Sequence, residues 1–195
     1  MSDSIFAANV PIELEPFQKP HPPLWYGVNS PSNAQRTGER GMNAVANAPA
    51  AVIRGMGETY WPAAAEAGMR QPRLGMNRHI VIAEDREVAL NAARRAYRVW
   101  FASFMKLWRE NNTPPVGVNY PEEIDGFIAT GLAAVGTPAD VRAILQGQFR
   151  ESGANYLGCR FAFGDLSLEE SLRSVDLFTR EVMPHLHAES RQAAE

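Results

Sequence analysis

The sequence has a single cysteine, no long apolar run and no excess of basic residues. With Cys159 alone among 195 residues, no disulfide can form within the chain, which favours a reducing, cytoplasmic setting. No stretch approaches the ~20 consecutive apolar residues that cross a bilayer. The start of the chain has no basic segment followed by an apolar one, so we expect no secretory signal. A net charge of −3 does not resemble the basic footprint of a nucleic-acid-binding protein.

What is present is typical of a packed α/β protein. Hydrophobic residues make up 45% of the chain and charged residues 21%, as in ordinary globular proteins. The length suits one domain, since such units usually have roughly 100–200 residues. We therefore predict a single domain over residues 1–195, with frayed tails at 1–9 and 187–195.

Four short β-like segments alternate with helix-like segments along the chain. The strands are expected near residues 23–28, 42–46, 75–83 and 154–162. The first is apolar rather than alternating, as in a strand buried on both faces of a parallel sheet. It is followed by Ser30-Pro31, an N-cap residue with proline at the first helical position, which opens a helix to about Arg40.

The other helices have comparable start and stop signals. We expect a second helix from about Pro49, interrupted near Trp61-Pro62, and a long third helix from about Arg86 to Trp108. Two more begin at capping motifs, Thr137-Pro-Ala-Asp140 and Ser167-Leu-Glu-Glu170, and Pro184 is expected to end the last one. Residues 110–136 form a long irregular stretch, which is often functional at such length.

Strand and helix alternating in this way predict parallel strands joined by right-handed crossovers. Two architectures satisfy that pattern: a small, open, doubly wound sheet, or part of a (β/α)8 barrel. A complete barrel needs eight strands and about 250 residues. Four strands correspond to half a barrel.

Several segments resemble the C-terminal half of the luciferase-like, flavin-dependent monooxygenases. They include Val10-Pro-Ile-Glu through Pro-Pro-Leu-Trp25, Gly136-Thr-Pro-Ala-Asp-Val141, Gly153-Ala-Asn-Tyr156, Arg160-Phe-Ala-Phe-Gly-Asp-Leu166 and Leu172 through Pro184. The resemblance covers about residues 10–186 and implies strands five to eight of a (β/α)8 TIM barrel. It further implies a flavoprotein that uses reduced FMN, or in some branches F420, with O2 to oxidise a small organic substrate.

Full-length family members carry about as much sequence again before these segments. The missing half lies on another polypeptide, two copies pair, or the gene is truncated, and the sequence does not choose among these. We therefore expect a homo-oligomer or a complementing half-barrel, with a flavin reductase as a possible further partner. The alternative function is a non-catalytic half-barrel subunit that self-associates or pairs with a full-length relative. Neither nucleic acid nor a membrane is an expected partner.

The turn after the first strand is the best candidate for a coenzyme site. It leaves the C-terminal end of a strand and opens a helix, where free N–H groups and the helix dipole favour a phosphate. The family resemblance implies that Ser30 and neighbouring groups hold the flavin phosphate. The predicted set is Gly27, Val28, Asn29, Ser30 and Asn33. Capping of the helix alone is the competing interpretation.

Candidate substrate-pocket residues follow the last strand. Arg160 and Asp165 are expected either to line a substrate cavity or to pair with each other and fix the loop. Phe161 and Phe163 alternate around Ala162, so both are expected on one side of the sheet, in the core or in the pocket wall. The aromatic residues Trp100, Phe101, Phe104 and Trp108 suit core packing or an interface.

No catalytic or metal-binding signature is present. His185 and His187 have chelate spacing but lack a nearby carboxylate or cysteine, so we expect no metal site. His79 lies within a strand and is expected to be an interior residue rather than a general base, while Cys159 is expected to be a small buried hydrophobic residue. The lack of a catalytic motif is compatible with a flavoenzyme, in which the coenzyme performs the difficult chemistry.

Overall fold

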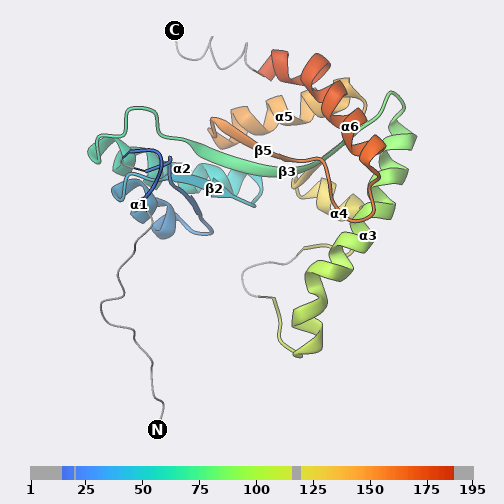
Figure 1. Ribbon diagram of the computed structural model, residues 1–195, viewed down its shortest axis with the longest axis horizontal. Coiled ribbons are helices and arrows are strands. Elements are labelled where there is room, and N and C mark those ends of the chain that lie inside the picture. The colour runs from blue at the N-terminus through green and yellow to red at the C-terminus, as the bar shows by residue number, and fades with distance from the viewer. Residues whose placement is uncertain (1–14, 20, 116–119, 187–195) are drawn as a thin grey trace.

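The computed structural model describes residues 15–19, 21–115 and 120–186 (Figure 1). The strands are β1 (Trp25–Gly27), β2 (Asn43–Ala46), β3 (Leu74–Ile82), β4 (Ala133–Gly136) and β5 (Tyr156–Arg160). The helices are α1 (Pro31–Glu39), α2 (Ala50–Glu66), α3 (Arg86–Glu110), α4 (Ile124–Ala129), α5 (Pro138–Ser152) and α6 (Leu168–Leu177), followed by a π-helical segment, Phe178–Val182. The tails that the sequence predicts to fray lie outside the described residues, so that prediction stays open.

The strands pair in parallel, and β3 is the centre of the sheet. β1 pairs with β2, and β2 pairs with the first residues of β3. The His79 N–H donates to the Leu132 carbonyl, so the backbone N–H and C=O groups of odd-numbered β3 residues point to the edge shared by β2 and β4. The Asn155 N–H donates to the Leu74 carbonyl, so even-numbered residues face β5. β2 and β4 therefore follow one another along one edge of β3, and β5 occupies the other.

Side chains on the convex face of the sheet form the main contacts with the crossover helices. Leu74 and Met76 pack in one cluster with residues of α1 and α2. Farther along β3, Ile80 and Ile82 pack in a second cluster with residues of α5, α6 and the π-helical segment. Helices α1, α2, α5 and α6 therefore cover the same face. Since β1, β2, β3 and β5 also follow one another in chain order, the sheet is singly wound, as in a barrel wall, and not doubly wound.

The opposite face of the sheet is concave. Trp25 of β1 and Tyr156 of β5 meet there, with ring centroids 4.6 Å apart. Between them lies Gly75 of β3, where an added Cβ would come within 3.5 Å of both rings. The four strands thus curl far enough for the first and last to touch, which gives a partial (β/α)8 barrel of four barrel strands. The fold class predicted from the sequence is confirmed.

Helices α3 and α4 lie on the other side of the sheet from α5 and α6 (Figure 1). They pack against Val81 of β3, against Ala83 just after it and against residues of β4 in a third cluster, to which Tyr97 and Phe101 of α3 and Phe127 of α4 contribute. Helices α3 and α4 and strand β4 therefore pack on the C-terminal half of β3. The N-terminal half of β3 lies between β2 and β5, in the barrel wall. Among the described residues, no helix is both long enough and apolar enough to span a membrane.

Ser174 of α6 completes the edge of β3 that β5 does not reach. Its Oγ accepts a hydrogen bond from the Ile82 N–H at 3.0 Å and donates one to the Ile82 carbonyl at 3.2 Å. Ser174 is almost fully buried. One hydroxyl therefore satisfies both polar groups of a buried strand residue, which would otherwise be costly to leave unpaired.

Residues 110–136 are more ordered than the sequence predicts. They contain α4 and β4, and β4 pairs with His79–Ile82 of β3. The expected irregular stretch is therefore wrong over this part, while residues 116–119 lie outside the described residues. Each element is only a few residues long, too short for hydrophobic periodicity to reveal it.

Three predicted boundaries are also wrong. Helix α2 continues through Pro62 instead of breaking there, and the last helix continues past Pro184 after its π-helical segment. Strand β5 ends at Arg160, and Phe161 and Phe163 consequently pack in different clusters on opposite sides of the sheet. The period-two argument holds only inside a strand, and both residues lie beyond its end.

Candidate functional site

A cavity of about 330 Å³ opens on the concave face, towards the C-terminal ends of the barrel strands. Its strand side is formed by Asn47 just after β2, by Asn77, Arg78 and His79 of β3, and by Gly158, Cys159 and Arg160 of β5. Its other side is formed by Trp100, Phe104, Tyr120, Phe127 and Leu132. In barrels and open α/β sheets alike, this end of the strands is where ligands bind.

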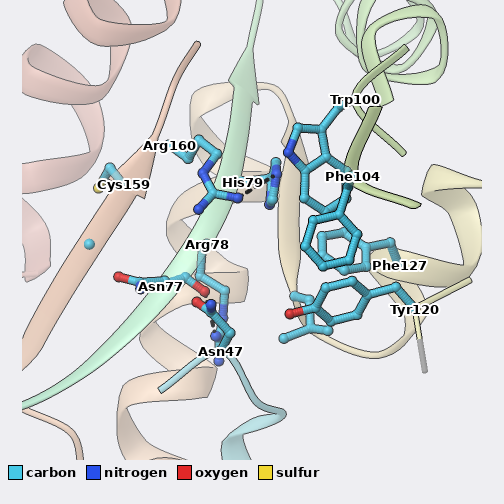
Figure 2. A pocket seen from close by; sticks show the side chains of 12 residues that line it. Asn47, Asn77, Arg78, His79, Trp100, Phe104, Tyr120, Phe127, Cys159 and Arg160 are labelled. Carbon is cyan, nitrogen blue, oxygen red and sulfur yellow. Dashed lines mark hydrogen bonds between the residues drawn. The ribbon is translucent and has the colours of Figure 1, made fainter. Parts of the chain in front are cut away.

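One side of the cavity is a wall of aromatic rings (Figure 2). Trp100 and Phe104 of α3 are stacked with ring centroids 5.0 Å apart, and Tyr120 lies 5.5 Å from Phe104. Phe127 of α4 lies 5.2 Å from Tyr120. Such a wall suits the apolar part of an organic molecule. Of the aromatic residues on α3, Phe101 is therefore buried in the core, and Trp100 and Phe104 line the cavity.

His79 and Arg160 form the polar centre of the cavity. Arg160 Nη1 lies 3.1 Å from His79 Nε2 and donates to it, because a guanidinium has no acceptor atom. The imidazole is surrounded edge-on by the rings of Trp100, Phe127 and Phe163. Burial, with a further contribution from the charge of Arg160, lowers the pKa of His79 to about 3. His79 is therefore neutral, with its proton on Nδ1 and its Nε2 holding Arg160 in place.

Gly158 creates the space for Asn77. A Cβ added at Gly158 would collide with Asn77 Oδ1, so only glycine lets this amide lie across β5. The sequence prediction did not include Asn47 or Asn77 as site residues. A usable signal for Asn77 was present, namely three consecutive polar residues, 77–79, inside an otherwise apolar strand.

Arg78 lies on β3 with its side chain almost completely buried. Its Nε donates to Gln148 Oε1 at 2.6 Å and its Nη1 to the Asn77 carbonyl at 2.8 Å. Within the described residues, its Nη2 has no hydrogen-bond partner. Burial lowers the pKa of Arg78 to about 10, so it still carries a positive charge at neutral pH. Burial also raises the pKa of the Cys159 thiol to about 12, which disfavours a thiolate nucleophile.

The predicted coenzyme turn lies at the junction of β1 and α1. Gly27 ends β1, and the Val28 N–H donates to the Val45 carbonyl of β2, which fixes the turn on the strand ends. Ser30 is the N-cap of α1, and its Oγ accepts from the Asn33 N–H at 3.3 Å. Asn33 Nδ2 donates to Asn29 Oδ1 at 2.7 Å. The structure thus brings these five residues together in one turn at the rim of the sheet.

Arg36, one turn into α1, is a further basic residue near this turn. Its Nη2 donates to Asn33 Oδ1 at 2.5 Å. A second cavity, of about 270 Å³, is lined by Asn33 and Arg36 together with Tyr26, Thr37, Arg40 and Met42. The sequence prediction omitted Arg36, although its spacing of three residues from Asn33 places the two side chains next to each other on the helix.

The three predicted substrate-pocket residues lie in different places. Arg160 lines the cavity. Phe161 packs against Phe178 in the convex core, with ring centroids 5.3 Å apart. Asp165 pairs with Arg95 of α3 at 3.1 Å, and Arg95 also binds Glu170. Among the described residues, no group of three or more histidines, cysteines and carboxylates is placed to hold a metal ion.

Comparisons with known proteins agree with this architecture. A family model of luciferase-like monooxygenases matches residues 5–156. An uncharacterized protein of Sinorhizobium fredii, y4wF, is 36% identical over 178 residues, which cover 90% of this chain and 52% of that protein. The chain therefore spans about half the length of this relative.

Two solved structures share the fold at low sequence identity. Monooxygenase RslO1 from Streptomyces bottropensis has a TM-score of 0.72 at 23% identity, covering 87% of this chain and 50% of that one. The oxygenating constituent of 3,6-diketocamphane monooxygenase from Pseudomonas putida, in complex with FMN, has a TM-score of 0.65 at 19% identity, covering 85% and 49%. The family match extends over most of the chain, so this protein belongs to the luciferase-like monooxygenase family.

Proposed function

We propose that this chain forms the coenzyme-phosphate site and part of the substrate cavity of a flavin-dependent monooxygenase. The observation that carries the proposal is the Ser30 turn at the start of α1. Ser30 Oγ accepts the Asn33 N–H as a cap and lies 3.2 Å from Ser32 Oγ. When Ser32 is the donor of that second hydrogen bond, the Ser30 hydroxyl proton can bind a phosphate oxygen. The first turn of α1 contains no acidic residue, so the positive end of the helix dipole is not neutralised there.

A comparison with two other helices supports this assignment. Helices α5 and α6 begin with capping boxes in which Asp140 and Glu170 bind the cap residues Thr137 and Ser167. Those carboxylates occupy the positive helix ends and would repel an anion. Helix α1 instead has Arg36 one turn away, bonded to Asn33 of the same turn. A phosphate at α1 would meet N–H groups, a hydroxyl and a guanidinium.

The coenzyme we propose is FMN, with F420 as the alternative. The 3,6-diketocamphane monooxygenase neighbour is described in complex with FMN, and another, at a TM-score of 0.54, is an F420-dependent reductase from Methanopyrus kandleri. When bound and reduced, the flavin supplies the electrons that activate O2. This chain's residues would hold the phosphate at Ser30, while the aromatic wall around Trp100 and Phe104 would position the substrate and exclude water.

The four barrel strands of this chain correspond to about half of the neighbouring monooxygenase structures. The chain covers 50% and 49% of the two monooxygenase structures described above. Leu24, just before β1, and Trp25 and Tyr26 of β1 are exposed, as apolar residues of a strand are when a neighbouring strand is absent. We therefore propose that the chain acts within a homo-oligomer or with a complementing half-barrel, and that a flavin reductase supplies reduced coenzyme.

The test compares FMN with riboflavin, which is the same ring system without a phosphate. Flavin fluorescence titrations should show FMN binding more tightly than riboflavin, by about 10- to 100-fold for hydrogen bonds to a charged group. Ser30→Ala should reduce that ratio strongly and leave riboflavin binding unchanged. Ser167→Ala is the matched control, since it removes the same hydroxyl from the cap of α6. F420 titrated in parallel decides the coenzyme class.

Two results would overturn the proposal. Equal affinity for FMN and riboflavin would show that the chain does not bind the flavin phosphate. A folded wild-type chain that binds neither FMN nor F420 would favour the non-catalytic half-barrel instead.

A further inference from the structure

The charge of the cavity is unbalanced. Twelve residues line it, among them Arg78 and Arg160, and none is an aspartate or a glutamate. Other arginines of the chain behave differently: Arg94 pairs with Asp125 and Arg98 with Glu123. In the part of the chain that the structure describes, Arg160 has no carboxylate partner.

The groups that do contact Arg160 cannot neutralise it. One is the uncharged His79, which accepts a single hydrogen bond from Nη1. The other is the ring of Trp100, whose centroid lies 5.9 Å from the guanidinium carbon. Arg160 is exposed to solvent at this point, so a ligand can reach it. The other N–H groups of its planar guanidinium have no hydrogen-bond partner within residues 15–19, 21–115 and 120–186, and they can bind two oxygens at once.

Arg78 also lines the cavity, but its side chain is bonded to Gln148 of α5, the helix that covers the convex face of the sheet. Among the residues that the structure describes, its guanidinium has two neutral partners, Gln148 and the Asn77 carbonyl, and its buried Nη2 has none. A buried charge without a counter-ion is costly unless something compensates it. An anion held by Arg160 would offset part of that cost by its charge, without contact with Arg78.

We propose that the cavity binds an organic carboxylate, with the carboxylate group on Arg160 and its hydrocarbon part against Trp100 and Phe104. The turnover of such a ligand rests on the function proposed above, whereas its binding does not. A carboxylate is planar and pairs with two N–H groups of an arginine, while the ring wall opposite suits a flat or aliphatic body. The cavity volume of about 330 Å³ is at the small end of ligand pockets, which suits a small acid.

The phosphate of the coenzyme is a second possible anion for Arg160. We assign the phosphate to the Ser30 turn, because N–H groups and a hydroxyl converge there at the start of a helix. Arg160 is bordered by the aromatic rings that a phosphate would not use. Inorganic phosphate is therefore included in the test as the competing ligand.

The test uses ligand-observed NMR titrations of the full chain without flavin. The probes are benzoate and benzamide, which have nearly the same shape and differ in charge. We expect benzoate to bind and benzamide to bind about 10- to 100-fold more weakly. Arg160→Gln should weaken the binding of benzoate by a similar factor. Arg160→Lys should retain only part of the wild-type affinity, because lysine lacks the planar, forked donors of arginine.

Arg70→Gln is the matched control, because Arg70 is exposed, lies outside the cavity and loses the same charge. It should leave benzoate binding unchanged. Three results would overturn the proposal: equal binding of benzoate and benzamide, benzoate binding that survives Arg160→Gln, or phosphate displacing benzoate at lower concentration than benzoate itself binds. Since no flavin is present, these outcomes are independent of the FMN titrations, and either proposal can fail alone.

Discussion

The Ser30 turn and the Arg160 cavity lie at the same end of the sheet but are built in different ways. The turn is local: Ser30 contacts Asn33 three residues away, and Asn33 contacts Asn29 four residues away. The cavity is assembled from distant segments, and His79 and Arg160 are separated by 81 residues in the chain. Capping residues and a short strand are sufficient for the first. The second requires α3, α4 and β5 all to be packed on β3.

This difference has an energetic counterpart. Loss of the turn's hydrogen bonds affects one helix end, whereas the position of α3 determines whether the cavity has an aromatic wall at all. Variants that shift α3 should therefore have large effects, and variants at the turn small ones.

The largest effect is expected at Gly164, in the segment after β5. Its φ is +59°, and an added Cβ would collide with the Ala96 carbonyl of α3. Gly164→Ala should lower the free energy of unfolding by about 2–5 kcal/mol, from left-handed strain plus the steric conflict. Gly153→Ala is the control, because Gly153 has a φ of +66° but no atom within 4 Å of the added Cβ.

Urea denaturation measures both variants. Gly153→Ala should cost about 1–2 kcal/mol from backbone strain alone. Equal losses for the two glycines would mean that contact between the segment after β5 and α3 contributes nothing to stability.

His79 should make the free energy of unfolding of the chain depend on pH. Its pKa is lowered to about 3 by burial and then by Arg160, against an unfolded value of about 6.5. Between these values the unfolded chain binds a proton that the folded chain does not, so stability increases with pH in this window. When the pH falls from about 7 to about 5, the titration of His79 should lower the free energy of unfolding by about 2 kcal/mol.

The measurement is the free energy of unfolding of wild type and His79→Gln at both pH values. The variant should show a shallower loss, while His21→Gln, which removes an exposed histidine, should behave as wild type. An unchanged slope in His79→Gln would show that the buried imidazole is protonated in the folded chain.

The same contrast explains what the sequence could predict. Four of the five strands, the Ser30 cap and the capping motifs at Thr137 and Ser167 follow from local residue patterns, and the structure has them, whereas β4 was not predicted. The cavity does not follow, because no local pattern relates His79 to Arg160. The pocket prediction relied on closeness to the end of β5, and Phe161 and Asp165 lie just past that end but point elsewhere.

A smaller effect is expected at Ser30, where two roles can be separated. Ser30→Ala removes the cap and should cost about 1 kcal/mol. Ser30→Asp retains a good cap, so its stability should remain near that of wild type, while its negative charge should abolish preferential binding of FMN over riboflavin. Thermal unfolding and flavin fluorescence measure the two properties. If Ser30→Asp binds FMN as wild type does, the phosphate lies away from this helix end.

The smallest effect is expected at Asp165, which separates a loop contact from a cavity role. Asp165 and Arg95 are both well exposed, and Arg95 retains Glu170 as a second partner. Water screens such pairs, so Asp165→Asn should change the free energy of unfolding by less than about 1 kcal/mol. If Asp165 only fixes the loop against α3, then benzoate binding, FMN binding and their dependence on Arg160 should all be unchanged. A clear change in benzoate affinity with stability preserved would instead mean that this carboxylate acts on the ligand, and that the loop after β5 closes over the cavity when it is occupied.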